Sequence, residues 1–178
     1  MLIFGLKIGT ELNSLHGTKE LITQAEKSLC FILSTEKARI CLYDKVTNQM
    51  IWYGQNGEEN RGDLSMGIFG HVMTKKEIEN ITNGYNHELF NGKVDIETSM
   101  PLICWPIKHP NNENEVIGAI EAIYARGLKG VSALKKSTLN PFDHELLELF
   151  AKQLSQSIVN RTRYGSSSEN QQIELKQH

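Results

Sequence analysis

The stretch that decides the fold is Ser99–Tyr124, which reads SMPLICWPIKHPNNENEVIGAIEAIY. Two apolar runs, Met100–Ile107 and Val116–Tyr124, flank a polar segment that holds Pro110 and several Asn and Glu residues. Apolar runs of this length, separated by turn-forming residues, predict two antiparallel strands joined by a hairpin loop. Because nearly every residue in both runs is apolar, we expect both faces of the sheet to be covered, with helices on at least one side.

Helices are predicted before and after this hairpin. Apolar residues recur at helical spacing from Thr18, the expected N-cap, to about Ser34. The second helix has Asn140 as its expected N-cap and Pro141 at its first position, and is expected to end near Arg163. Its apolar stripe is wide enough for burial on two sides, by the sheet and by another helix or a second subunit. This stripe comprises Leu146, Leu147, Leu149, Phe150, Ala151, Leu154, Ser157 and Ile158.

The chain between these helices alternates between strand and loop patterns. Ala38–Tyr43 and Gln49–Tyr53 predict a hairpin, and Ile78–Thr82 predicts a short strand. The polar, glycine-rich stretch Gly54–Asp63 predicts a loop. Asn83–Glu97 predicts irregular structure with about one helical turn, and such loops on a rigid scaffold usually carry specificity.

A short helix is predicted within Leu64–Lys75, where Gly67 and Gly70 are three residues apart. This spacing allows a neighbouring backbone to approach closely. Apolar residues between the two glycines argue against a nucleic-acid clamp of the Gly-x-x-Gly type.

Composition restricts the function classes. The 178 residues are 39% hydrophobic and 22% charged with a net charge of −2, which is typical of a globular domain and gives no reason to expect nucleic acid or a membrane as partner. We expect a cytoplasmic protein, because the apolar start lacks a basic region and a cleavage site. The odd number of cysteines, Cys30, Cys41 and Cys104, predicts free thiols.

No catalytic constellation is visible. The sequence has no nucleophile elbow, no P-loop and no dinucleotide-binding glycine pattern, and no two histidines are spaced as ligands of one metal. We therefore expect a protein that is not an enzyme.

Four motifs in sequence order resemble the GAF domain. They are Gly67-Ile68-Phe69-Gly70-His71-Val72, Ser99–Ile107, Val116–Ala122 and Asn140–Leu147. The resemblance implies an α+β fold with a central antiparallel sheet of five or six strands. The N- and C-terminal helices would cover one face, and the short helix and variable loops would roof a small-molecule pocket on the other. Residues 1–163 would form this single domain and 164–178 a flexible tail.

Departures from the family pattern limit the ligand. Cyclic-nucleotide-binding members carry an Asn-Lys pair where this chain has Tyr124 and Ala125, and only Asp143 of the Asp-Glu pair is kept. The buried Lys–Asp pair of such members is therefore missing, unless Arg126 takes its place, and this disfavours a cyclic nucleotide. The absence of a Cys-His dipeptide disfavours an attached bilin, so the cofactor is left unknown.

Glu121 is the most unusual residue, because it lies in the middle of an apolar strand on the face expected to hold Ile117, Ala119 and Ile123. A carboxyl group there must be hydrogen-bonded or wet, so it is either a ligand contact or a structural ion pair. The ligand-binding candidates are Phe69, Tyr85, Ser99, Trp105, Glu121 and Tyr124. The partner-contact candidates come from the basic stretch Arg126–Leu139 and are Arg126, Lys129, Lys135 and Lys136.

Two functions follow from this reading. The first is a non-catalytic regulatory or sensory module that binds a small ligand, forms dimers through its terminal helices, or does both. The second is a structural or interaction subunit of a larger intracellular assembly, which keeps the fold without a working ligand pocket.

Overall fold

The computed structural model describes residues 17–123 and 141–175, and the side chains of the last helix as far as Arg161. The elements in chain order are α2 (Thr18–Leu33), β1 (Ala38–Asp44), β2 (Gln49–Tyr53), β3 (Glu59–Asp63), α3 (Gly67–Lys75), β4 (Glu79–Ile81), the 3₁₀ turn η1 (Gly84–Asn86), β5 (Leu102–His109), β6 (Asn112–Ile123) and α4 (Pro141–Leu175).

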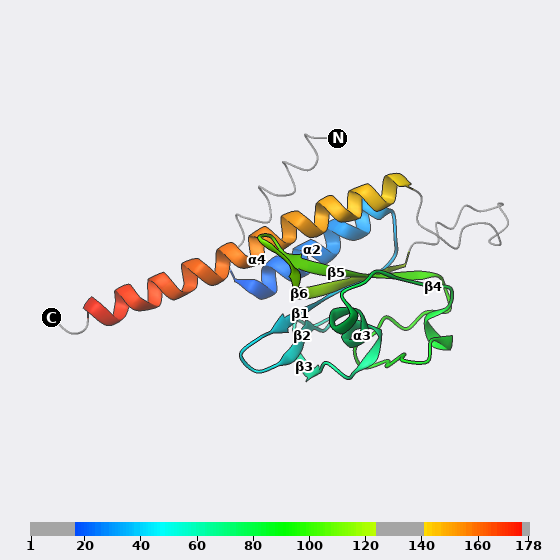
Figure 1. The fold of residues 1–178 in the computed structure, drawn as a ribbon, viewed down its shortest axis with the longest axis horizontal. Coiled ribbons are helices and arrows are strands. Elements are labelled where there is room, and N and C mark those ends of the chain that lie inside the picture. Colours follow the sequence, from blue (N-terminus) through cyan, green and yellow to red (C-terminus); the bar gives the residue numbers. More distant parts are fainter. Residues whose placement is uncertain (1–16, 124–140, 176–178) are drawn as a thin grey trace.

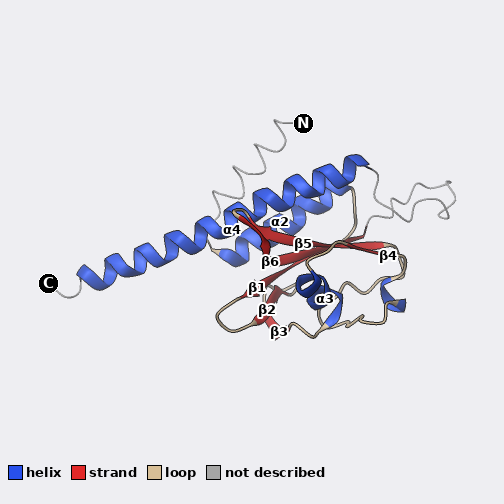
Figure 2. Cartoon of the chain, viewed as in Figure 1, coloured by secondary structure: helices blue, strands red, loops and turns tan. Residues whose placement is uncertain are grey.

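A six-stranded antiparallel sheet forms the centre of the fold, in the order β3-β2-β1-β6-β5-β4 (Figure 2). The sequence-predicted hairpin supplies β5 and β6, and β6 pairs with β1 on its other side. Helices α2 and α4 lie together on one face, and α3 lies on the other (Figure 1). The predicted α+β arrangement of sheet, terminal helices and short helix is confirmed.

The two faces of the sheet carry separate apolar cores. We call the face that α2 and α4 cover the helix face. Its core joins Leu21, Leu29, Ile120, Phe150 and Leu154, among other buried residues of α2, α4 and the sheet. The core under α3 joins buried residues of that helix to the opposite sheet face, chiefly Met50, Trp52, Ile68, Phe69, Val72, Leu102 and Cys104.

The hairpin departs from the prediction in its loop and in its register. Residues expected in a polar loop belong to the strands, because β5 extends to His109 and β6 begins at Asn112. Ile107 pairs with Gly118 and Lys108 with Val116, so Ile117 is an extra residue in β6. Such a bulge reverses the side on which preceding residues point. Ile117 consequently packs with the helix-face core, and its expected placement beside Glu121 is wrong.

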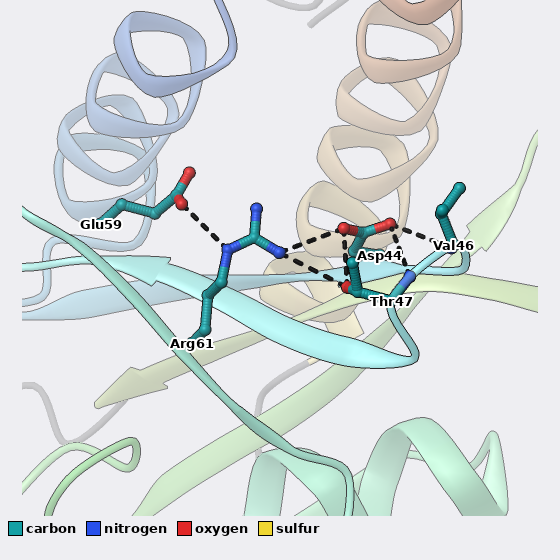
Figure 3. Close-up of polar contacts among 5 residues, drawn as sticks. All are labelled: Asp44, Val46, Thr47, Glu59 and Arg61. Carbon is teal, nitrogen blue, oxygen red and sulfur yellow. Dashed lines mark hydrogen bonds and ion pairs between the residues drawn. The ribbon is translucent and has the colours of Figure 1, made fainter.

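The stretch Gly54–Asp63 is only partly a loop, because Glu59–Asp63 forms the edge strand β3. Every second side chain of this strand is exposed and charged, so the sequence has no apolar pattern that predicts a strand here. Arg61 links the strand to the neighbouring turn, donating to Glu59 and to Asp44 at 3.0 and 3.2 Å (Figure 3). Charged side chains of this kind are a common protection of sheet edges.

The helix ends also differ from the sequence prediction. Gly17, with φ of 87°, precedes the first turn of α2, so Thr18 lies inside the helix and is not its N-cap. In α4 the buried stripe runs through Leu147, Phe150 and Leu154, whereas Leu149 is 41% exposed. The helix continues to Leu175, past the end expected near Arg163. The domain boundary and the flexible tail stay predictions.

In the described part of the chain, no helix combines the length and the apolar character needed to cross a lipid bilayer.

Candidate functional site

Two carboxyl groups, those of Asp95 and Glu121, are completely buried between α3 and the sheet. Glu121 belongs to the central strand β6, and Asp95 belongs to the irregular segment between η1 and β5. Buried acids are costly unless they are hydrogen-bonded or protonated. The hydrogen-bond partners of the two carboxyl groups therefore indicate the role of this site.

Asp95 holds the first turn of α3. Its carboxylate accepts hydrogen bonds from the backbone N–H groups of Ile68 at 2.9 Å, Phe69 at 3.2 Å and Asn91 at 2.8 Å. The residue before α3, Met66, has no side chain that could cap these groups. A negative charge at the positive end of a helix is also electrostatically favourable. Asp95 thus acts as a helix cap supplied by a distant segment.

The glycines of α3 make room for these contacts. A Cβ on Gly67 would lie 2.6 Å from an Asp95 carboxylate oxygen, and the φ of +70° at Gly67 also favours glycine. A Cβ on Gly70 would lie 2.0 Å from the carbonyl oxygen of Leu64. The predicted close approach of a neighbouring backbone is confirmed at Gly70, whereas the atoms nearest Gly67 belong to the side chains of Asp95 and Val94.

The surroundings of Glu121 favour its neutral, protonated form. Its Oε2 accepts a hydrogen bond from the backbone N–H of Ile96 at 2.8 Å, and its Oε1 has no hydrogen-bond partner. Burial raises the pKa of Glu121 well above its usual value, and the negative charge of Asp95 raises it further. The Ile96 N–H and the positive charge of Arg39 lower this pKa less than burial and Asp95 raise it.

Arg39 completes the cluster from β1, where it lies opposite Glu121 in the strand register. Its guanidinium donates to the carbonyl oxygens of Val94 and Asp95. Arg39 and Glu121 therefore bind the backbone of the same segment from two neighbouring strands. The cluster of Arg39, Asp95 and Glu121 fastens residues 91–96 and α3 to the sheet.

The space beneath α3 is filled by the protein itself. Phe69, Met50 and Cys104 are fully buried there, and Phe90 packs against them. Burial also raises the pKa of the Cys41 and Cys104 thiols well above the usual value, which makes them unreactive. The buried side chains on this face pack against one another and join α3 to the sheet.

The ligand candidates from the sequence do not come together at one place. Phe69 and Glu121 are both buried on the α3 side, Tyr85 is 52% exposed, and Ser99 is exposed. Trp105 lies on the opposite face of the sheet, where its ring meets that of His144 on α4 edge-to-face at 4.7 Å. Their ligand-binding roles stay predictions. Lying outside the described residues are Tyr124 and the partner-contact candidates Arg126, Lys129, Lys135 and Lys136.

Sequence reasoning missed Arg39 and Asp95. Asp95 lies between Val94 and Ile96, so an acid flanked by apolar residues was the available signal, as it was for Glu121. Arg39 alternates with buried neighbours at the start of β1. All three cysteines are free in the structure. Within the described residues, no three His, Cys, Asp or Glu side chains are arranged to hold a metal ion.

This architecture is the fold of a GAF domain. The GAF domain of a phosphoenolpyruvate-protein phosphotransferase from Coxiella burnetii superposes with a TM-score of 0.70 at 15% identity, covering 93% of this chain and 96% of that one. The corresponding domain from Acinetobacter gives a TM-score of 0.69 at 18% identity, covering 91% and 94%. No protein-family model matches the sequence.

Two curated relatives match part of the sequence. One is the probable 3′,5′-cyclic phosphodiesterase pde-5 of Caenorhabditis elegans, 32% identical over 94 residues, which are 48% of this chain and 13% of that protein. The other is the dual 3′,5′-cyclic-AMP and -GMP phosphodiesterase 11 of Drosophila melanogaster, 34% identical over 68 residues, which are 36% of this chain and 4% of that protein. The chain thus spans only a small part of the length of these relatives.

Proposed function

We propose that the chain is a non-catalytic regulatory module that acts by self-association through the layer formed by α2 and α4. Its GAF fold supports the class of module. The closed α3 side and the apolar side chains exposed on the helix layer support the mode of action.

The two helices run antiparallel (Figure 1), and Arg161 near the far end of the described α4 side chains donates to the carbonyl oxygen of Gly17 at 3.0 Å. The last turns of α2 therefore lie beside the first turns of α4. Large apolar side chains are exposed at this end: Phe31 is 74% exposed, Phe142 51% and Leu149 41%. Large apolar side chains that are exposed to solvent favour burial against a partner. The exposure of these three side chains on α2 and α4 is the observation that carries the proposal.

A second copy of the chain is the occupant we favour. Among the described residues, α2 and the sheet cover one side of the wide α4 stripe, and Phe142 and Leu149 on α4 are exposed, which leaves a surface for a subunit. The helix also runs to Leu175, beyond the sheet (Figure 1), and a long helix offers a path by which association affects a neighbouring domain.

A second candidate function is sensing of a small ligand on the α3 side. The observation that favours it is Oε1 of Glu121, which has no hydrogen-bond partner and which a polar group of a ligand would satisfy. Such a ligand must displace residues 91–96, because these residues cover the carboxyl group. This makes the sensory function dependent on a rearrangement of the segment.

Sedimentation velocity of the full chain over a range of concentrations tests self-association. We expect a dimer that the double variant Phe31→Ser, Leu149→Gln weakens by about tenfold or more, which corresponds to about 1.4 kcal/mol. Val46→Ser is the matched control, because Val46 is 95% exposed on the turn after β1. A chain that stays monomeric throughout, or a dimer equally sensitive to both changes, would contradict the proposal and favour a subunit that binds a different protein.

A further inference from the structure

A groove of about 630 Å³ lies between α4 and the outer part of β5. It lies at the outer edge of β5, where Trp105 borders it from the sheet face that α2 and α4 cover and the residues after α3 border it from the other side. Asp95 and Glu121 lie on the opposite face and take no part in it. Its volume falls within the range of small-molecule sites in proteins.

The floor of the groove is apolar and partly aromatic. Trp105 is only 6% exposed, and the His144 ring stands edge-to-face against it. Pro106, Ile78 and Ala151 contribute further apolar surface. The α4 wall is fixed to the strand, since the hydroxyl of Ser155 donates to the carbonyl oxygen of Lys108.

The rim carries both signs of charge in equal number, with three lysines and three glutamates. Lys152 forms an ion pair with Glu148 at 3.3 Å, and Lys76 donates to the carbonyl oxygen of Asn114.

The other three charged side chains of the rim have no partner of opposite charge among the described residues. The Lys108 ammonium and the carboxylates of Glu77 and Glu113 are exposed and form no ion pair with any side chain in the described ranges. The groove thus offers one unpaired cation and two unpaired anions around an apolar floor.

We infer that this groove binds a small zwitterion with an aromatic body, the chemistry of an aromatic amino acid. The ring packs on the Trp105–His144 floor, because aromatic rings favour offset and edge contacts with one another. The ligand carboxylate meets Lys108, and its ammonium meets Glu77 or Glu113. A singly charged ligand leaves one sign of the rim unmatched. This inference is independent of the proposed self-association, because Phe31, Phe142 and Leu149 do not line the groove.

Three probes separate the contributions of the two charges. L-phenylalanine carries both, N-acetyl-L-phenylalanine only the carboxylate, and L-phenylalanine amide only the ammonium. Titrated into the ¹⁵N-labelled full chain, L-phenylalanine is expected to shift the indole N–H signal of Trp105 in a saturable way. The indole signal of Trp52, which lies on the other sheet face, serves as the internal reference. Each singly charged probe should bind about two- to fivefold more weakly, the range expected for one exposed ion pair.

The variant Lys108→Gln assigns the carboxylate contact. It should weaken L-phenylalanine about two- to fivefold and leave the affinity of the amide unchanged. Lys27→Gln is the control, because Lys27 is exposed on α2 outside the groove. The inference is overturned if L-phenylalanine gives no saturable shift up to its solubility, if the three probes bind equally, if Trp52 shifts in place of Trp105, or if Lys108→Gln has no effect.

Discussion

Glu26 on α2 accepts a hydrogen bond from the backbone N–H of Ile40 on β1 at 3.0 Å. The neighbouring strand β2 pairs with β1 only from Leu42 onward, so this N–H has no partner strand on that side. The carboxyl group therefore substitutes for a missing strand contact and joins α2 to the sheet. Burial raises the pKa of Glu26 from 4.5 to about 7, and the Ile40 N–H and Arg39 lower it less.

Stability should depend on pH through Glu26. The folded state binds the proton more tightly than the unfolded chain, so this stabilisation is complete below pH 4.5 and is lost as the pH rises to about 7. The loss is about 3 kcal/mol, since 1.36 kcal/mol corresponds to one pH unit. In urea unfolding, Glu26→Gln should lack this decline, whereas the exposed control Glu36→Gln should keep it. Parallel curves for the wild type and Glu26→Gln would contradict the assignment.

Glu121→Gln should be tolerated at neutral pH, with a change in the free energy of unfolding below about 1 kcal/mol. The amide keeps an acceptor for the Ile96 N–H and resembles the protonated acid that the structure requires. Glu121→Ala should cost about 2–4 kcal/mol, because it leaves that N–H unpaired and opens a cavity. Because burial raises the pKa of Glu121, the wild type should also lose stability relative to the Gln variant as the pH rises above 4.5. Equal costs for Gln and Ala would show that Glu121 is not held neutral.

Asp95→Ala should release the first turn of α3. Three backbone N–H groups lose their acceptor, those of Ile68, Phe69 and Asn91, and unfolding free energy should fall by about 3 kcal/mol. Amide hydrogen exchange should accelerate at these residues more than in α2. Asp95→Asn keeps one carbonyl oxygen as an acceptor, so its free energy of unfolding should lie between those of the wild type and Asp95→Ala. Uniform acceleration throughout the chain would indicate general destabilisation without a capping role.

Gly70→Ala should destabilise the chain by about 3 kcal/mol or more, because its Cβ would overlap the backbone carbonyl of Leu64, which cannot move independently. Gly54→Ala is the matched control, since its Cβ meets only the end of the flexible Glu58 side chain. Thermal unfolding compares the two variants. Similar melting temperatures would mean that the segment before α3 adapts easily.

Apolar patterning was sufficient to predict β5 and β6 as a hairpin, because burial on both faces leaves a strong signal, whereas the number of strands came from the family resemblance. It failed for β3, whose exposed side chains Glu59, Arg61 and Asp63 resemble a loop. It also failed at Ile117, since a bulge depends on the partner strand and not on the local pattern.

The candidate site was predictable only in part. Glu121 was visible as an acid in an apolar strand, but the sequence could not show that Asp95 lies against it. Trp105 was grouped with Glu121, although strand register places the two side chains on opposite faces of the sheet. Contacts between distant segments are set by the packing of α3, which no short motif encodes.

The short strand β4 pairs only with Leu102–Cys104, which leaves the rest of β5 without a partner strand on its outer side in the described chain. Pro106 has no N–H to donate there, and Ser155 already occupies the carbonyl of Lys108. The opposite edge strand of the sheet is β3, whose exposed side chains are charged. These features disfavour pairing between the sheet edges of neighbouring molecules, which is the first step toward a fibre.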